Sequence, residues 1–459
     1  MDQNQCDLVI IGGGPAGHAA ALRGIELGAR VALVEKDALG GVCVNRGCIP
    51  TKFMLEVAHA AKTVHGLKAF GLQGSLEQVD LRKVTSRRKA IIRGLVDGID
   101  SNLRMVGVDV QQGTARFEGP RQIIVTGPDG GERRIAARKV VVATGSLPIP
   151  ATALGVEEQE VVAGERAFEI EHIPDDLLVI GGGAVGLELA AIYNALGSRV
   201  TVVEKLPRLL PREDTEMAGF LKEMLEQSGV SFELNAVVSD LHVDENGNKV
   251  VEISNGQRVQ RVSVQEVIVA HGRTPNVAGL GLDRIGVALD NGAVKTSARM
   301  ETSVEGVYAA GDVAGGPMLA HVASAQARVA VDNALGIPST FSQRVVPRCI
   351  YTFPELACVG LTEEEAIEKG LQVKVGTSSL ATNARAATMS YRDGLVKVIA
   401  EARHGDIVGV HILGPLATEM IAPAVVAVSL ECTVGELGRI CQAHPTLAET
   451  LADAIRAAG

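Results

Sequence analysis

Positive charge is in short supply in this sequence. Its 459 residues carry 54 acidic and 44 basic side chains, which gives a net charge of −10. A surface of that sign repels the phosphate backbones of nucleic acids and the headgroups of anionic lipids. We therefore expect no nucleic-acid partner and no role at a membrane surface.

Long apolar runs are also missing. No stretch of about 18 apolar residues, the length of a membrane-spanning helix, occurs in the chain. The first ten residues, MDQNQCDLVI, include an acid where a secretory signal carries basic residues. These absences predict a cytoplasmic protein with no membrane partner.

Cysteine is sparse, with 7 residues in the whole chain. Small secreted domains that are stapled by disulfides carry dense, even-numbered sets, whereas cytosolic thiols are kept reduced. Any disulfide in this chain is therefore expected to be redox-active.

Glycine, by contrast, is abundant, and an internal repeat explains part of the excess. The 52 glycines exceed the average share of about 7%. Residues 12–36 and 181–205 align without gaps and share twelve identities in 25 positions. Such self-similarity indicates two copies of one supersecondary unit. A chain of 459 residues also has room for roughly three or four domains.

Each copy predicts a buried parallel strand, a glycine turn, a helix and a second strand. The apolar runs 8–11 and 177–180 have the length and β-branching of such first strands. A G-x-G-x-x-G pattern follows each run, formed by Gly12, Gly14 and Gly17 and then by Gly181, Gly183 and Gly186. A glutamate follows each second strand directly: Glu35 after 31–34 and Glu204 after 200–203.

This arrangement is the fingerprint of a dinucleotide-binding unit. The glycines allow a tight turn close to a pyrophosphate, the helix amino terminus faces that anion, and the acid accepts a hydrogen bond from a ribose hydroxyl. A single copy would be compatible with a ligand-free turn, but two copies with the same terminal acid favour two bound dinucleotides. Glu204 also favours NAD over NADP, because a carboxylate repels a 2′-phosphate.

The rest of the chain divides at further strand ends and at prolines. Strands ending in glycine are expected at 140–145, 267–273 and 307–312, and prolines near 148–150 predict a linker. Beyond about residue 344, strands at 348–353, 394–400 and 407–413 alternate with helical patterns at 363–369 and 418–430. This alternation predicts a separate α+β domain with an antiparallel sheet.

Two cysteines, Cys43 and Cys48, lie five positions apart just after the first unit. A structural disulfide closing so short a loop would contribute only about 2 kcal/mol. Pro50 suits the first turn of a following helix, whose positive end would favour a thiolate at Cys48. The pair is interpreted as redox-active, and the alternative is two buried free cysteines in a turn.

The motifs around these residues resemble those of the pyridine nucleotide-disulfide oxidoreductases, along essentially the whole chain. The similarity is greatest to the dihydrolipoamide dehydrogenases of that family. It is carried by GGVCVNRGCIPTK at 40–52, PMLAH at 317–321, IYTFPELACVGLTE at 350–363, HILGPLATEM at 411–420 and AHPTLAE at 443–449.

The resemblance implies an α/β fold with two Rossmann-like dinucleotide-binding domains, one for FAD and one for NAD, and a C-terminal α+β dimerisation domain. The implied bounds are 1–147 for FAD binding, 148–271 for NAD binding, 272–343 for a central domain that completes the FAD site, and 344–459 for dimerisation. A homodimer follows from the same resemblance.

The resemblance also implies roles for individual residues. Cys43 corresponds to the thiol that meets the substrate and Cys48 to the thiolate beside the flavin, while Lys52 and Glu188 correspond to a pair near the flavin ring. The alternative for that pair is a solvated lysine and a surface glutamate. The implied FAD contacts are the first glycine turn, Glu35, Lys52, Ala115, Thr144, Gly145, Asp312 and Ala320. The implied NAD contacts are the second glycine turn, Glu204, Val238 and Gly272. No metal site is expected.

His444 is the one of ten histidines that precedes a proline and lies five residues before a glutamate, Glu449. It resembles the family's histidine–glutamate dyad, in which the carboxylate orients the base, and the family's dyad comes from the partner subunit. An imidazole of pKa near 6.5 is suited to exchange protons with a thiol of pKa about 8.5. The alternative is a structural histidine.

The implied activity is oxidation of dihydrolipoamide, a small dithiol carried by the lipoyl domains of a multienzyme complex, with reduction of NAD. The alternatives are a reductase for another disulfide and a non-catalytic redox sensor that binds both dinucleotides. Two departures from the family pattern are Gln442, where a second histidine is common, and residues 324–326, where acidic residues are common.

Overall fold

The computed structural model describes residues 5–459, which form two compact units. The first unit contains the residues up to Phe53 together with Arg82–Ile149 and Gly272–Ser342. The second contains Met54–Leu81, Pro150–His271 and Gln343–Gly459. The four-domain division expected from the sequence remains a prediction.

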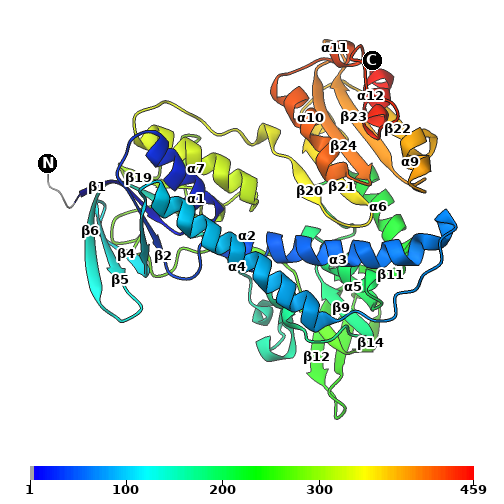
Figure 1. The fold of residues 1–459 in the computed structure, drawn as a ribbon, viewed down its shortest axis with the longest axis horizontal. Helices are drawn as coiled ribbons and strands as arrows, with labels where there is room; N and C mark the ends of the chain where they lie inside the picture. The colour runs from blue at the N-terminus through cyan, green and yellow to red at the C-terminus, as the bar shows by residue number, and fades with distance from the viewer. Residues whose placement is uncertain (1–4) are drawn as a thin grey trace. The chain divides into compact units, whose positions relative to one another are not determined.

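A seven-stranded sheet forms the centre of the first unit (Figure 1). Five of its strands are parallel, in the order β3 (Asp109–Gln112), β2 (Val31–Glu35), β1 (Gln5–Ile11), β6 (Glu132–Val142) and β19 (Val307–Ala309). The first half of β6 also pairs antiparallel with β5 (Gln122–Thr126), which pairs with β4 (Thr114–Gly119). Helices α1 (Pro15–Glu26) and α7 (Ala320–Ala334) pack side by side and share one core with β1 and β2 (Figure 1).

The second unit repeats this architecture. Its first sheet is parallel throughout, in the order β11 (Val230–Leu234), β10 (Arg199–Glu204), β9 (Asp176–Ile180), β15 (Glu266–Val269) and β8 (Val162–Ala163). An antiparallel meander follows, made of β12 (Val237–Val243), β13 (Lys249–Ser254) and β14 (Val259–Val264). Helix α5 (Ala184–Ala195) takes the place of α1. The repeat predicted from the sequence is therefore confirmed as two copies of one fold.

The carboxy-terminal part of the second unit is built on an antiparallel sheet, as predicted. Its order is β20 (Arg348–Ile350), β21 (Glu355–Gly360), β24 (Ile407–Gly414), β23 (Leu395–Glu401) and β22 (Val373–Ser379). Helices α10 (Ala417–Ser429) and α12 (Ala448–Ala457) pack on it. The single strand expected at 348–353 is wrong, because β20 ends at Ile350 and Pro354, which has no N–H, precedes β21.

Other elements connect these sheets. The helices are α2 (Gly41–Asn45), α3 (Cys48–Gly66), α4 (Leu81–Met105), α6 (Thr215–Gln227), α8 (Glu363–Glu368), α9 (Ala384–Thr388) and α11 (Val434–Leu437), and the short strands are β7 (Ser146–Pro148), β16 (Arg273–Pro275), β17 (Leu289–Asp290) and β18 (Ala293–Val294). Among residues 5–459, no helix combines the length and apolar character needed to cross a bilayer.

A buried lysine ties α6 to the carboxy-terminal sheet within the second unit. The Lys397 side chain, on β23, is 2% exposed and forms ion pairs of 2.7–3.0 Å with Asp214, Glu216 and Glu363. Burial alone would lower the pKa of Lys397, but hydrogen bonds to these carboxylates outweigh it and raise the pKa. Asp214, at the amino terminus of α6, is fully buried.

Replacing Lys397 with methionine is expected to destabilise the protein by roughly 3–5 kcal/mol at pH 7, because the buried Asp214 carboxylate would lose its counter-charge. A raised lysine pKa stabilises the fold fully below the ordinary value of about 10.4 and less as the pH rises above it. The midpoint of thermal unfolding should therefore fall at pH 7, and the gap to the native chain should narrow above pH 10. The exposed Lys374, changed to methionine, is the control; an equal effect of both variants would contradict the prediction.

Candidate active site

The first glycine turn joins β1 to α1, and close packing explains two of its glycines. Gly12 has a φ of +108°, and a Cβ added there would lie 2.3 Å from the Ala143 carbonyl oxygen. A Cβ added at Gly17 would lie 1.8 Å from the Gly12 carbonyl oxygen. Contacts as short as these leave room for glycine alone.

The second turn, between β9 and α5, repeats these constraints. Gly181 has a φ of +115°, and its added Cβ would lie 2.5 Å from the Ala270 carbonyl oxygen. At Gly186 the added Cβ would lie 1.9 Å from the Gly181 carbonyl oxygen. The two turns are therefore constrained by the same contacts at equivalent positions.

The middle glycines, Gly14 and Gly183, differ because nothing in the protein requires them. Both have ordinary extended backbone angles, and the nearest atom to an added Cβ is 3.8 Å away at Gly14, with none within 4 Å at Gly183. Each is the N-cap of its helix, and neither helix has a side-chain cap or an acid in its first turn. The space and the unpaired helix-end amides suit a close-lying anionic group such as a pyrophosphate.

The acids at the ends of the second strands accept hydrogen bonds from both glycine turns. Glu35 accepts hydrogen bonds from the amides of Gly13, at 2.6 Å, and Asp37, at 2.7 Å. Glu204 accepts from the amides of Gly182, at 2.7 Å, and Leu206, at 2.8 Å. A carboxylate has about four acceptor positions, so each acid keeps capacity for a ribose hydroxyl.

A pocket of about 100 Å³ beside the first turn brings together four residues predicted to contact FAD. They are Gly12, Glu35, Ala115 and Thr144. Segment 276–280 also lines the pocket, although no motif in the sequence predicts its contact with FAD. The Thr144 hydroxyl donates to the Asn276 carbonyl oxygen at 2.7 Å, and the Asn276 side chain donates back to the Thr144 carbonyl at 3.2 Å. No spacing in the sequence indicates this pairing.

Asp312 follows β19 and is held by partners from β7 and β16. Its carboxylate accepts from the Ser146 hydroxyl at 2.6 Å, and the Arg273 guanidinium donates to that hydroxyl at 2.8 Å. The preceding Gly311 donates its amide to the buried Gln326 side chain at 2.8 Å. Gln326, in one of the two segments that depart from the family pattern, thus supplies the acceptor that fixes this turn.

The remaining predicted cofactor residues lie at element boundaries. Gly145 and Gly272 have φ values of +71° and +126°. Ala320 is the first residue of α7, and Val238 is a buried residue of β12. Their contacts with a dinucleotide remain predictions.

The two cysteines lie in α2 and at the start of α3. Cys48 is the first residue of α3, which places Pro50 in the first turn as predicted. Both are present as thiols. The segment is bound to the first glycine turn, because the Gly40 amide donates to the Gly13 carbonyl at 2.8 Å and a Cβ on Gly41 would lie 2.8 Å from the Gly14 Cα.

The two thiols have different environments. A hydrogen bond with Cys48 is the largest influence on Cys43 and raises its pKa, and burial and the charge of Cys48 raise it further. Lys52 acts in the opposite direction. The positive end of α3 favours negative charge at Cys48. In the reduced pair, Cys43 therefore keeps its proton and Cys48 is the better site for a thiolate.

Lys52 and Glu188 lie on helices that follow the thiols and the second turn. Glu188 is 5% exposed, which is inconsistent with the alternative of a surface glutamate. It accepts a hydrogen bond from the Tyr351 amide at 3.1 Å. Burial, followed by nearby Cys349 and Glu188, raises the pKa of Tyr351 to about 12. The pairing of Lys52 with Glu188 stays a prediction.

His444 and Glu449 form the expected dyad. His444 Nδ1 lies 3.0 Å from a Glu449 carboxylate oxygen, and the other oxygen accepts from the Thr446 amide at 2.9 Å. The Thr446 amide and His444 lower the pKa of Glu449. An ionised Glu449 fixes the proton on Nδ1 and leaves Nε2 as the free basic nitrogen. The His444 side chain is 71% exposed.

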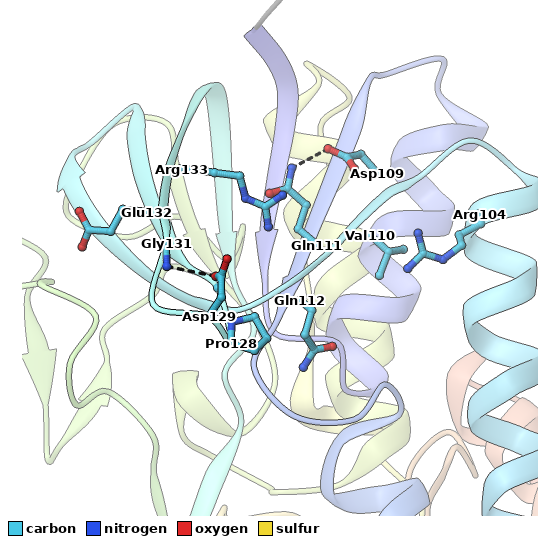
Figure 2. Close-up of a pocket in the computed structure, with 11 residues that line it drawn as sticks. Arg104, Asp109, Val110, Gln111, Gln112, Pro128, Asp129, Gly131, Glu132 and Arg133 are labelled. Atoms are coloured by element: carbon cyan, nitrogen blue, oxygen red, sulfur yellow. Dashed lines mark hydrogen bonds between the residues drawn. The ribbon is translucent and has the colours of Figure 1, made fainter.

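Two other features include none of these residues. A pocket of about 620 Å³ between β3 and the β5–β6 turn, lined by Arg104, Asp109, Gln111 and Arg133 among others, contains no predicted site residue (Figure 2). On the β23–β24 turn, Glu401, His404 and Asp406 have the spacing of metal ligands. Glu401 already accepts from two amides there and closes the turn.

Comparisons with known proteins agree with this geometry. Residues 6–327 match the family described as pyridine nucleotide-disulphide oxidoreductase, and residues 346–455 match that family's dimerisation domain. The chain is 43% identical to a dihydrolipoyl dehydrogenase of Thermus scotoductus over 98% of this chain and 97% of that enzyme. A dihydrolipoyl dehydrogenase of Chlorobaculum tepidum is 37% identical over 98% and 96%. A crystal structure of LpdA from Mycobacterium tuberculosis has a TM-score of 0.91 at 29% identity, covering 98% of both chains.

Proposed function

The chain belongs to the pyridine nucleotide-disulphide oxidoreductase family, and on that basis we propose that it oxidises dihydrolipoamide to lipoamide and reduces NAD. The observation that carries the proposal is the attachment of the thiol segment to the first glycine turn, through Gly40 and Gly13. A thiol pair fixed to a dinucleotide turn is built to exchange electrons with that dinucleotide.

Two cofactors, FAD and NAD, serve this activity. The first turn, Glu35 and Asp312 would hold FAD, and the second turn and Glu204 would hold NAD. When bound, these groups supply the transfer of two electrons from the thiol pair to NAD. The protein supplies the positions of the groups and the charges around them.

The chain's own chemistry begins with a proton. His444 Nε2 accepts a proton from one thiol of the substrate, and the resulting thiolate attacks the Cys43 sulfur of the Cys43–Cys48 disulfide. Cys48 leaves as a thiolate, which the amino terminus of α3 stabilises. The second substrate sulfur then attacks the substrate sulfur of the mixed disulfide, and its proton passes to the departing Cys43 sulfur. Lipoamide is released, Cys43 is left as a thiol, Cys48 as a thiolate, and the first proton stays on His444.

The dyad requires a neighbouring subunit in this proposal. His444 is largely exposed in a single chain and lies in the region that matches the dimerisation domain. A homodimer would place His444 of one chain against the thiols of the other. The lipoyl domains of a multienzyme complex are the proposed source of the dithiol, and the cytoplasmic location stays a prediction.

Steady-state assays of NAD reduction test the function. Dihydrolipoamide is expected to be oxidised far faster than reduced glutathione or dithiothreitol at equal concentration. Faster turnover of another dithiol would identify a reductase for a different disulfide. Binding of both dinucleotides without turnover of any dithiol would identify a redox sensor.

The preference for NADH over NADPH is expected to be roughly 100-fold, because repulsion between Glu204 and a 2′-phosphate costs several kcal/mol. Glu204→Gln should narrow the preference while it keeps an acceptor for the Gly182 amide. Glu204→Arg should narrow the preference further. It should also slow flavin reduction by both coenzymes, because the hydrogen bond from the Gly182 amide is lost. Rapid-mixing measurements of flavin reduction in the reverse direction give both rates; equal rates in the native chain would contradict the assignment.

A further inference from the structure

The first half of α4 carries a concentration of basic side chains that the proposed chemistry does not use. Between residues 82 and 93, six of twelve residues are lysine or arginine and none is acidic, in a chain whose net charge is −10. The bases do not form a continuous charge run in the sequence, because half-buried Val84, Ile91 and Ile92 lie between them.

Three of the bases form a stripe along one exposed side of the helix. Arg82, Lys89 and Arg93 are spaced by seven and four residues, which places them on one helical face, and all three are exposed. At 1.5 Å per residue, this basic stripe is roughly 16 Å long. Ile99 and Leu103, near the other end of α4, pack into the core of the first unit and fix the rotation of the helix.

The basic stripe is not compensated within the described chain. No ion pair or hydrogen bond of residues 5–459 engages the side chains of Arg82, Lys89 or Arg93, whereas Arg104 on the same helix pairs with Asp100 at 2.9 Å. Bases near a helix amino terminus oppose the helix dipole, and like charges four residues apart repel. The stripe therefore costs stability, which is typical of a surface retained for a partner.

We infer that the basic stripe is a docking surface for an acidic protein domain that carries the dithiol substrate. The inference rests on the proposed function, since a carrier-bound substrate requires contact with its carrier. The stripe belongs to the same compact unit as Cys43 and Cys48. Because the chain as a whole is negative, an acidic carrier is attracted at α4 and repelled by the overall charge, which orients its approach.

The test compares two substrates with one variant. The variant carries Arg82→Gln, Lys89→Gln and Arg93→Gln, and the substrates are free dihydrolipoamide and a reduced lipoylated domain of net negative charge. For the domain, kcat/KM is expected to fall roughly tenfold at low salt, and the loss should shrink as salt screens the charges beyond a Debye length of about 10 Å at 0.1 M. For the uncharged free dithiol, kcat/KM should stay unchanged.

The control variant removes the same charge elsewhere. Arg258, Lys369 and Lys374 are exposed bases of the second unit, and their change to glutamine should leave both substrates unaffected. Equal kinetics of the two variants with the carrier domain would overturn the inference while free dihydrolipoamide turnover upholds the proposed function. A chain that oxidises neither substrate would overturn both.

Two further measurements separate other occupants of the stripe. Weaker binding of a DNA duplex by the α4 variant, with unchanged carrier kinetics, would assign the stripe to nucleic acid. Dissociation of the dimer in sedimentation experiments would assign it to a second copy of the chain. Either result would overturn the inference, and an intact dimer with the salt-dependent loss described above would support it.

Discussion

Replacement of His444 by glutamine is expected to slow dihydrolipoamide oxidation by roughly 10²–10⁴-fold, the range typical of a lost general base. Glutamine preserves the approximate size and a donor toward Glu449 but has no basic nitrogen. The half-reaction between NADH and the oxidised enzyme needs no proton from the substrate and should remain nearly intact. Steady-state turnover and rapid-mixing measurements of flavin reduction distinguish the two half-reactions.

His404 is a matched control for this experiment. It is an exposed histidine whose Nδ1 also lies near a glutamate, at 3.2 Å from Glu401. His404→Gln should leave both half-reactions unchanged. Glu449→Gln should lower the rate of dihydrolipoamide oxidation less than His444→Gln does. The imidazole remains, but the carboxylate that orients it and stabilises its positive charge is lost. Full dithiol turnover in His444→Gln would refute the assignment of the base.

The origin of the dyad can be tested by mixing inactive chains. A heterodimer of one His444→Gln chain and one Cys48→Ser chain would contain one intact site if His444 serves the thiols of the other subunit. Activity should then return in part. No recovery in verified mixed dimers would contradict the shared site and leave the role of His444 untouched.

Replacement of either active-site cysteine should lower the rate of dithiol turnover by roughly 10⁴-fold or more, because the disulfide cannot form. The two variants should differ in visible absorption while the flavin is oxidised, since neither variant has a disulfide to accept electrons in place of the flavin. Cys43→Ser should keep a long-wavelength band from the Cys48 thiolate to the flavin, and Cys48→Ser should lose it. The physical reason is that a hydrogen bond with Cys48 raises the pKa of Cys43, so the negative charge resides on Cys48.

Visible spectra of the two variants with oxidised flavin, compared with the two-electron-reduced native chain, check this assignment. Cys432→Ser is the control, since Cys432 is a free cysteine in the carboxy-terminal part of the second unit and is not one of the proposed active-site residues. Like the native chain, it should show the band after two-electron reduction and keep full turnover. A band that survives in Cys48→Ser and disappears in Cys43→Ser would reverse the roles of the two thiols.

Local sequence was sufficient for the two nucleotide-binding units. The glycines at 12, 17, 181 and 186 are readable from spacing because each is imposed by backbone atoms a few residues away or on the next strand. The dyad was readable for a similar reason, since His444 and Glu449 lie five residues apart and one helix start brings them together. Short-range geometry of this kind leaves a regular pattern in the chain.

Only the tertiary structure decided which distant segments meet at these sites. Asn276 reaches Thr144, and Arg273 and Ser146 hold Asp312, across separations of more than 120 residues that no periodicity encodes. The burial of Lys397 and the exposure of the α4 bases could not be predicted from the sequence either. A lysine has the same local conformational preferences whether its side chain is buried or exposed. Burial and long-range pairing depend on how whole sheets pack, and that packing is settled by the entire fold.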